Sequence, residues 1–98
     1  MADRIRHLLA YDIRDPRRLR RVHQLARDYG EPLQYSVFVC DLSKLELMRM
    51  RAAIVAEINL TVDSVAIFDL GAPTNRGVSC VELIGARREM PDAGPAIW

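Results

Sequence analysis

The sequence predicts an α+β protein in which two helices cover one face of a single antiparallel sheet. Strand-like runs of apolar and β-branched residues alternate with two segments that have apolar residues at helical spacing, in the order β-α-β-α-β-β. The chain has 98 residues, which is enough for one domain with a modest core. Half of the residues are hydrophobic and 28% are charged, a balance typical of a soluble globular protein rather than a disordered one.

The first strand and the first helix occupy the N-terminal third of the chain. Ile5 to Ile13 is apolar enough to be a central strand. A helix then begins with Asp15 as its N-cap and Pro16 at its first position, and Gly30 is expected to end it in a left-handed conformation. Its buried stripe is Leu19, Val22, Leu25, Ala26 and Tyr29, and its outward side carries Arg17, Arg20, Arg21, Gln24 and Arg27.

The segment over residues 31–41 is rich in β-branched and aromatic residues, and the sequence leaves open whether it is one bent strand or two short ones. Strand alternation places Leu33, Tyr35, Val37 and Val39 on one face and Gln34, Ser36, Phe38 and Cys40 on the other. Ser43 and Glu46 predict a capping box that opens a second helix. The apolar positions of that helix are Leu47, Met50, Ile54 and Ile58, and Asn59 is expected to end it.

The last third predicts two more strands and a tail. Asp63 to Leu70 is the third strand region, and Val78 to Gly85 is the final strand. Residues 1–85 therefore form the domain, and residues 86–98 form a C-terminal tail with no period, either loose or laid across a partner. Cys40 and Cys80 lie in apolar runs without zinc-like spacing, so we expect buried free thiols.

This order of elements fits a two-layer sandwich of the ferredoxin-like kind, with an antiparallel sheet and both helices on one face. Such a sheet leaves its other face bare. A continuous apolar face on a small monomer is a liability, so we expect a two-fold homodimer that buries sheet against sheet.

The net charge of +1 hides an asymmetry along the chain. The first 29 residues contain eight arginines and four aspartates, a net charge of +4, and the remainder carries −3. Arginine suits phosphate because its planar fork donates two hydrogen bonds at once, although an ordinary solvated helix face is the alternative. The sequence shows no signal peptide and no apolar run long enough for a membrane span, so we expect a cytoplasmic protein.

Asp12 is the candidate functional residue. It lies near the end of the most hydrophobic strand, where a carboxylate costs stability unless it is solvated, paired or bound to a cation. One interpretation is a salt bridge to Arg14 or Arg18. The other is that a homodimer brings two copies of Asp12 together, so that one divalent cation relieves their repulsion and arginines hold a phosphodiester backbone. His23 is expected to be solvated on the polar side of its helix.

Four motifs in register resemble the CRISPR-associated Cas-two proteins. They are "YDIRDPRRLRRV", "YGEPLQYSVF", the "LS" before the second helix and "DSVAIFDLG", and the last strand "VELIG" is also similar to that family's closing strand. The resemblance covers residues 5–85. It implies a ferredoxin-like homodimer whose C-terminal strand is exchanged between subunits.

The resemblance also implies roles for individual residues. Asp12 matches the family's catalytic and metal-binding aspartate, for Mg²⁺ or Mn²⁺, and Tyr11, Ser36 and Phe38 match supporting positions. The nucleic-acid-binding set would be Arg14, Arg17, Arg18, Arg20 and Arg21, in which Arg18 and Arg20 match the family's basic positions and Leu19 departs from its pattern.

Two functions follow from the resemblance. The first is a metal-dependent endonuclease of low turnover that cuts single-stranded RNA or double-stranded DNA and is a partner of the Cas-one integrase in spacer acquisition, an antiviral defence. The second is a catalytically silent DNA-binding dimer that bridges integrase dimers. A ferredoxin-like regulatory domain that binds a small molecule is a weaker third interpretation, because the chain lacks Gly-rich ligand loops.

Overall fold

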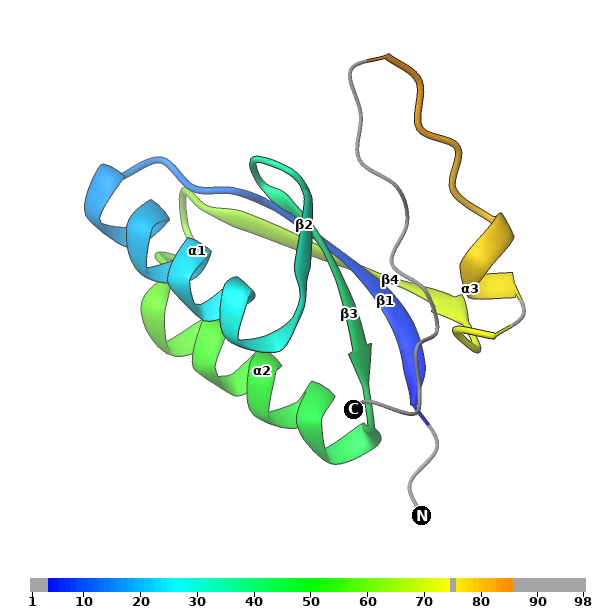
Figure 1. Cartoon of the computed structure of the whole chain (residues 1–98). Coiled ribbons are helices and arrows are strands. Elements are labelled where there is room, and N and C mark those ends of the chain that lie inside the picture. Colours follow the sequence, from blue (N-terminus) through cyan, green and yellow to red (C-terminus); the bar gives the residue numbers. More distant parts are fainter. Residues whose placement is uncertain (1–3, 75, 86–98) are drawn as a thin grey trace.

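The computed structural model describes residues 4–74 and 76–85, and it forms a sheet with two long helices packed side by side against one face (Figure 1). The α+β prediction is therefore confirmed. In chain order the elements are β1 (Ile5–Asp12), α1 (Pro16–Tyr29), β2 (Glu31–Gln34), β3 (Val37–Leu42), α2 (Lys44–Glu57), β4 (Ser64–Gly71) and α3 (Arg76–Ser79).

The sheet has the order β2-β3-β1-β4 and every neighbouring pair is antiparallel, as in a ferredoxin-like sandwich. The apolar strand β1 lies at the centre, with β3 on one side and β4 on the other. Residues 31–42 form two strands separated by a turn at Tyr35 and Ser36, which answers the question that the sequence left open.

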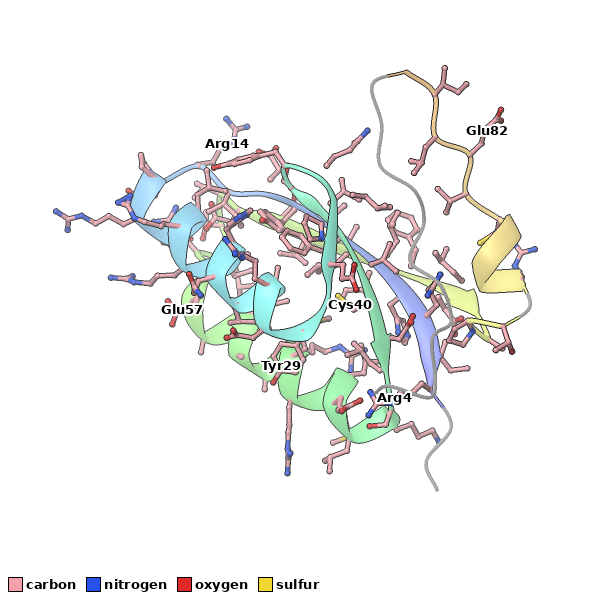
Figure 2. All side chains as sticks on the ribbon, viewed as in Figure 1. Arg4, Arg14, Tyr29, Cys40, Glu57 and Glu82 are labelled. Carbon is pink, nitrogen blue, oxygen red and sulfur yellow. The ribbon has the colours of Figure 1, made fainter. Side chains whose placement is uncertain are left out.

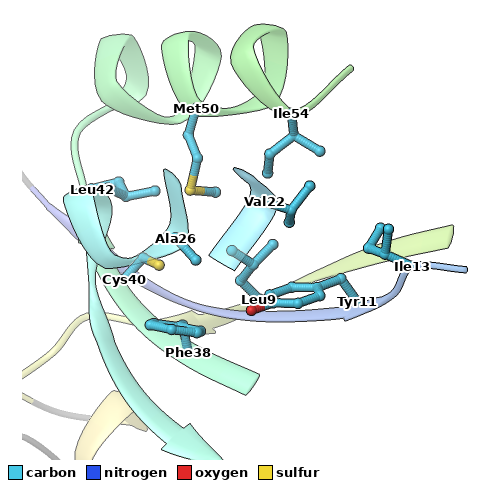
Figure 3. Close-up of a cluster of buried hydrophobic side chains, with 10 residues drawn as sticks. All are labelled: Leu9, Tyr11, Ile13, Val22, Ala26, Phe38, Cys40, Leu42, Met50 and Ile54. Atoms are coloured by element: carbon cyan, nitrogen blue, oxygen red, sulfur yellow. The ribbon is translucent and has the colours of Figure 1, made fainter. Parts of the chain in front are cut away.

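The hydrophobic core lies between the helices and one face of the sheet (Figure 3). Leu9 of β1, Phe38 of β3, Val22 of α1 and Met50 of α2 are fully buried there. Burial of each such large side chain stabilises the fold by about 1.5–3 kcal/mol. Because side chains alternate along a strand, the residues between them on β1 point to the opposite face, which the two long helices do not cover.

Both long helices begin as the sequence predicts. The Asp15 carboxylate accepts hydrogen bonds from the backbone N–H groups of Arg17 and Arg18, at 3.0 and 2.9 Å. The Ser43 hydroxyl accepts from Glu46 N–H at 3.2 Å, and the Glu46 carboxylate accepts from Ser43 N–H at 2.8 Å. Each cap satisfies backbone donors that the first helical turn leaves free.

The end of α1 differs from the prediction. Gly30 has φ −164°, which is extended and not left-handed. A side chain at this position would collide with the Val39 carbonyl oxygen and would lie 2.6 Å from Cys40 Sγ. Glycine is needed here because the end of the helix passes close to β3.

The predicted strand from Val78 to Gly85 is wrong for its first residues, because Arg76–Ser79 forms the short helix α3. Residues 80–85 form no strand within this chain, and Figure 1 shows them leading away from the sheet. Residues 80–85 therefore have no strand partner in the sheet of their own chain. The exchange of a C-terminal strand with a second copy stays a prediction. The predicted tail, residues 86–98, lies outside the described residues.

A buried ion pair ties α3 to the sheet. The Arg6 guanidinium is fully buried and donates to the Asp41 carboxylate at 2.7 and 2.9 Å and to the Gly77 carbonyl at 3.4 Å.

Cys40 is a buried free thiol, as predicted, and burial raises its pKa to about 12, whereas Cys80 is free and only half-buried. Within the described part of the chain, no helix is long and apolar enough to span a membrane.

Candidate nucleic-acid and metal site

Asp12 is the last residue of β1 and points away from the helices. Its neighbours Tyr11 and Ile13 are buried, whereas Asp12 is exposed, which is the alternation expected of a strand with one covered face. We call the side away from the two long helices the open sheet face; its members include Leu8, Ala10, Asp12, Val37, Ala66 and Phe68. Asp12 lies at the edge of this face, opposite Ser64 of β4.

The salt bridge that the sequence suggested for Asp12 does not form. Among the described residues, Asp12 makes no ion pair with either candidate arginine. The Arg14 side chain extends into solvent at the turn that follows β1 (Figure 2). The Arg18 side chain binds Asp63 instead. The carboxylate of Asp12 is therefore free to bind another group.

Asp63 holds the turn after β1 in place, a role that its position in the sequence did not indicate. Its buried carboxylate accepts from Arg18 Nε at 2.7 Å and Nη2 at 3.2 Å, from Arg14 N–H at 2.9 Å and from Asn59 N–H at 2.8 Å. The Arg18 guanidinium and these backbone donors keep the pKa of Asp63 far below its ordinary 3.8. The bonds join the start of α1 to the loop before β4, and so fix the turn that directly follows Asp12.

The predicted nucleic-acid-binding arginines fall into two groups. Arg14, Arg17, Arg20 and Arg21 are exposed, and among the described residues only Arg21 of these four forms a side-chain ion pair, with Glu57 at 3.8 Å on the surface. Exposed pairs of this kind contribute little to stability and exchange readily with a phosphate. Arg18 differs because Nε and Nη2, along one edge of its guanidinium, both donate to the buried Asp63 carboxylate, so it acts first as a structural residue.

The three supporting residues lie beneath the site rather than beside Asp12. Phe38 is fully buried in the core, and the Ser36 carbonyl accepts from Tyr11 N–H at 3.1 Å in the β2–β3 turn. The Tyr11 hydroxyl lies 2.9 Å from His23 Nδ1, on the face opposite Asp12. Burial raises the pKa of Tyr11 to about 12, with a smaller contribution from Tyr35, so the hydroxyl stays protonated at neutral pH.

The prediction that His23 is solvated is wrong. Its ring stacks on Tyr35 with centroids 5.3 Å apart, meets Phe38 edge-on at the same distance and hydrogen-bonds Tyr11. The helix turns this position toward the β2–β3 turn, which covers it. Helical spacing alone placed His23 on the polar side of α1, because the sequence did not show that the β2–β3 turn covers this position.

One chain supplies only part of a metal site. The described residues contain no cluster of three or more histidine, cysteine or acidic side chains that could hold a metal ion. Asp12 offers one free carboxylate, and Mg²⁺ is commonly bound through one or two carboxylates together with waters and substrate phosphates. Asp12 thus fits half of a shared site that a second chain would complete. An open hollow lined by Arg14, Thr61 and Val62 lies at the same end of the molecule.

The fold and the site define a small ferredoxin-like protein with an unpaired carboxylate at the end of its central strand, next to an arginine-rich helix. The sequence profile of the family described as "CRISPR associated protein Cas2" matches residues 5–77. This chain belongs to that family, in agreement with the resemblance seen in its motifs.

Two relatives and one solved structure illustrate the similarity. The relative from Thermodesulfovibrio yellowstonii, named CRISPR-associated endoribonuclease Cas2 2, is 39% identical over 89 residues, which cover 91% of this chain and 92% of the relative. The relative from Halalkalibacterium halodurans, named CRISPR-associated endonuclease Cas2, is 30% identical over 96 residues, which cover 93% and 97%. The crystal structure of Streptococcus pyogenes Cas2 matches with a TM-score of 0.72 and 32% identity, covering 82% of this chain and 99% of that one.

Proposed function

We propose that this chain is a CRISPR-associated endonuclease that works as a homodimer and hydrolyses phosphodiester bonds of single-stranded RNA or double-stranded DNA. The main support is the exposed Asp12 carboxylate, which makes no ion pair among the described residues although arginines surround it in the sequence. The names of the relatives, endoribonuclease and endonuclease, support the same reaction class. In this proposal the protein is also a partner of the Cas-one integrase in spacer acquisition.

The open sheet face supports the homodimer. It is lined by apolar side chains, and Phe68 on the edge strand β4 is 50% exposed in the single chain. A small domain gains stability by burying such a surface, and a two-fold pairing does so with one self-complementary patch. A two-fold axis that passes close to Asp12 would bring the two Asp12 carboxylates to one cleft. Two like charges repel unless a cation lies between them.

In this cleft, some residues of the chain would bind the metal ion and others would bind the phosphate. The two Asp12 carboxylates would hold Mg²⁺ or Mn²⁺, which when bound supplies Lewis-acid stabilisation of a phosphate. Arg17 and Arg20 would bind the phosphate backbone and stabilise the charge that develops on it. The proposal assigns no side chain the role of general base, so we expect the turnover to be low.

The test compares Asp12→Asn with Asp28→Asn, a matched change at an exposed position of α1. With Mg²⁺ and either labelled single-stranded RNA or duplex DNA, we expect Asp12→Asn to lower the cleavage rate by about 100-fold or more and Asp28→Asn to leave it within about twofold. Sedimentation should show that both variants keep the oligomeric state of the parent. Cleavage by Asp12→Asn at the parent's rate would place the chemistry elsewhere or in a contaminant.

The second candidate keeps the dimer and omits the chemistry: a scaffold that holds a short duplex and bridges two integrase dimers. It is supported by the exposed arginines of α1, which need no metal to bind DNA. The same Asp12→Asn variant separates the two functions. Normal spacer acquisition with this variant favours the scaffold, and loss of acquisition argues against a purely structural role.

A further inference from the structure

The second long helix, α2, is apolar on its outer side as well as on its inner side. Met50 and Ile54 face the core, as predicted. Leu45, Met48 and Val55 are 53%, 60% and 49% exposed. We call the outward residues the α2 stripe: Leu45, Met48, Ala52, Val55 and Ala56, which recur at the three- and four-residue spacing of one helix face and are all exposed.

The fold does not require this stripe. In a two-layer sandwich the outer side of a helix meets water, and surface helices are normally polar there. Helix α1, which lies beside α2 on the same face of the sheet, follows that rule with outward arginines (Figure 1). A helix that is apolar on all sides usually has neighbours on all sides. The α2 stripe is therefore apolar like a buried helix face, although it is exposed to solvent in the single chain.

The charges around the stripe are positive. Arg49 flanks it on one side, and Lys44 and Arg51 flank it on the other; all three are exposed and form no ion pair among the described residues. The two acidic residues of α2 are used elsewhere, since Glu46 binds Arg4 and Ser43 N–H and Glu57 faces Arg21. A partner that covers the stripe meets an apolar centre with cations on both flanks.

We propose that the α2 stripe is a docking surface for a protein partner that presents an amphipathic helix with Asp or Glu on both sides of its apolar face. Its apolar face would pack on the stripe, and its carboxylates would pair with the flanking cations. Ala52 and Ala56, one helical turn apart, leave a shallow seam that admits another helix closely. The surface lies on the helix layer, opposite the open sheet face, so it can be occupied in the homodimer.

Other occupants fit the observations less well. A second copy of α2 would place its arginines against Arg49 and Arg51, which is repulsive. Nucleic acid would meet leucine, methionine and valine at the centre of the surface, where phosphate finds no donor. An anionic membrane would suit the flanking charges, but the stripe lacks the aromatic side chains that usually enter the interface.

The test uses the full chain and two synthetic helical peptides of about 18 residues, each with Leu and Ala along one face. One peptide carries Glu on both flanks, and its twin carries Lys at the same positions. The variant Ala52→Glu adds a charge at the centre of the stripe, and Gln24→Glu makes the same charge change on the outer side of α1 as the matched control. Both sites are exposed, and circular dichroism checks that both variants fold.

We expect the Glu peptide to bind at least about tenfold more tightly than the Lys twin, with amide shifts over residues 44–56. Ala52→Glu should weaken that binding at least tenfold, and Gln24→Glu should change it by less than about twofold. Equal affinity for the two peptides, no binding of either, or binding insensitive to Ala52→Glu would overturn the proposal. So would loss of self-association, or of binding to phosphatidylserine vesicles, in Ala52→Glu, because either result would identify a different occupant.

Discussion

At the scale of single residues, the carboxylate of Asp63 organises the site although it does not belong to it. It is buried and accepts hydrogen bonds from two backbone N–H groups and from two nitrogens, Nε and Nη2, of the Arg18 guanidinium. A buried charge with this many donors is well solvated by the protein, whereas loss of the charge leaves the same donors poorly satisfied. The position of Asp12 and of the first turn of α1 depends on this one side chain.

We therefore expect Asp63→Asn to lower the melting temperature by about 5–10 °C at pH 7. Since the pKa of Asp63 is lowered in the folded protein, its charge stabilises the fold above the ordinary pKa of 3.8, and this contribution is lost as the pH falls toward the folded-state pKa. The deficit of Asp63→Asn relative to the parent should accordingly shrink below about pH 4. Calorimetry between pH 3 and pH 8 measures this difference in melting temperature, with Asp28→Asn as the exposed control. A difference that does not change with pH would contradict a lowered pKa of Asp63 in the folded protein.

The role of a residue could be predicted only where it depends on residues nearby in the sequence. Asp12 stands out because a charge at the end of an apolar strand is unusual, and the structure leaves it without the salt bridge that was its simplest explanation. Arg18 and Arg20 look alike in the sequence, yet only Arg18 reaches the buried Asp63, 45 positions further along the chain. His23 was misplaced for the same reason, because its neighbours Tyr11 and Tyr35 come from the sheet and from a turn.

At the scale of elements, the close approach of α1 to β3 constrains the sequence at one point. Gly30 has an extended backbone that any residue can adopt, so its conformation does not explain the glycine. The explanation is space: a Cβ atom at Gly30 would lie 2.6 Å from Cys40 Sγ and would collide with the Val39 carbonyl oxygen. Backbone atoms of a sheet cannot move aside as a flexible side chain can.

Gly30→Ala should therefore destabilise the protein by about 1–3 kcal/mol, because α1 must shift away from β3. Chemical denaturation measures this change. Asp28→Ala, an exposed change in the last turn of the same helix, should lie within about 0.5 kcal/mol of the parent. A Gly30→Ala protein as stable as that control would mean that α1 and β3 are further apart in solution.

Elements with local start signals were predicted closely, and elements that depend on distant partners were not. Asp15 and Ser43 each act as the predicted N-cap, since a cap is made by residues three positions apart at most. The last strand failed because strand formation needs a neighbour, and helix α3 instead packs on Arg6, 71 positions before Gly77 in the sequence. The outward side of α2 was missed because the prediction followed only its core-facing period.

At the scale of the whole molecule, three surfaces have different chemistry. The open sheet face is apolar with Asp12 at its edge, the outer side of α1 is basic, and the outer side of α2 is an apolar stripe between cations. Helix α1 opens at the end of β1, so its arginines and Asp12 share one end of the sheet, whereas the α2 stripe belongs to the neighbouring helix. This separation makes it possible to change one surface and leave the other two intact.

The basic surface of α1 gives the last prediction, which concerns duplex binding. Arg18 is unsuitable for this test because Arg18→Glu would disrupt the buried pair with Asp63 and unfold the site. The double variant Arg17→Glu with Arg20→Glu changes only exposed side chains. We expect it to weaken binding of a short DNA duplex by about 10- to 100-fold at moderate salt and to reduce the slope of log K against log salt by roughly one for each phosphate that the variant no longer neutralises.

The matched control is Arg49→Glu with Arg51→Glu on α2, which changes the net charge by the same amount on a different face. Long-range attraction weakens in both variants, but only direct binding to phosphate releases counterions and sets the salt slope. The α2 variant should therefore keep the parent's slope even where its affinity falls. If the slope falls equally in both variants, DNA is held by the overall charge of the helix layer, and the arginines of α1 have no special role.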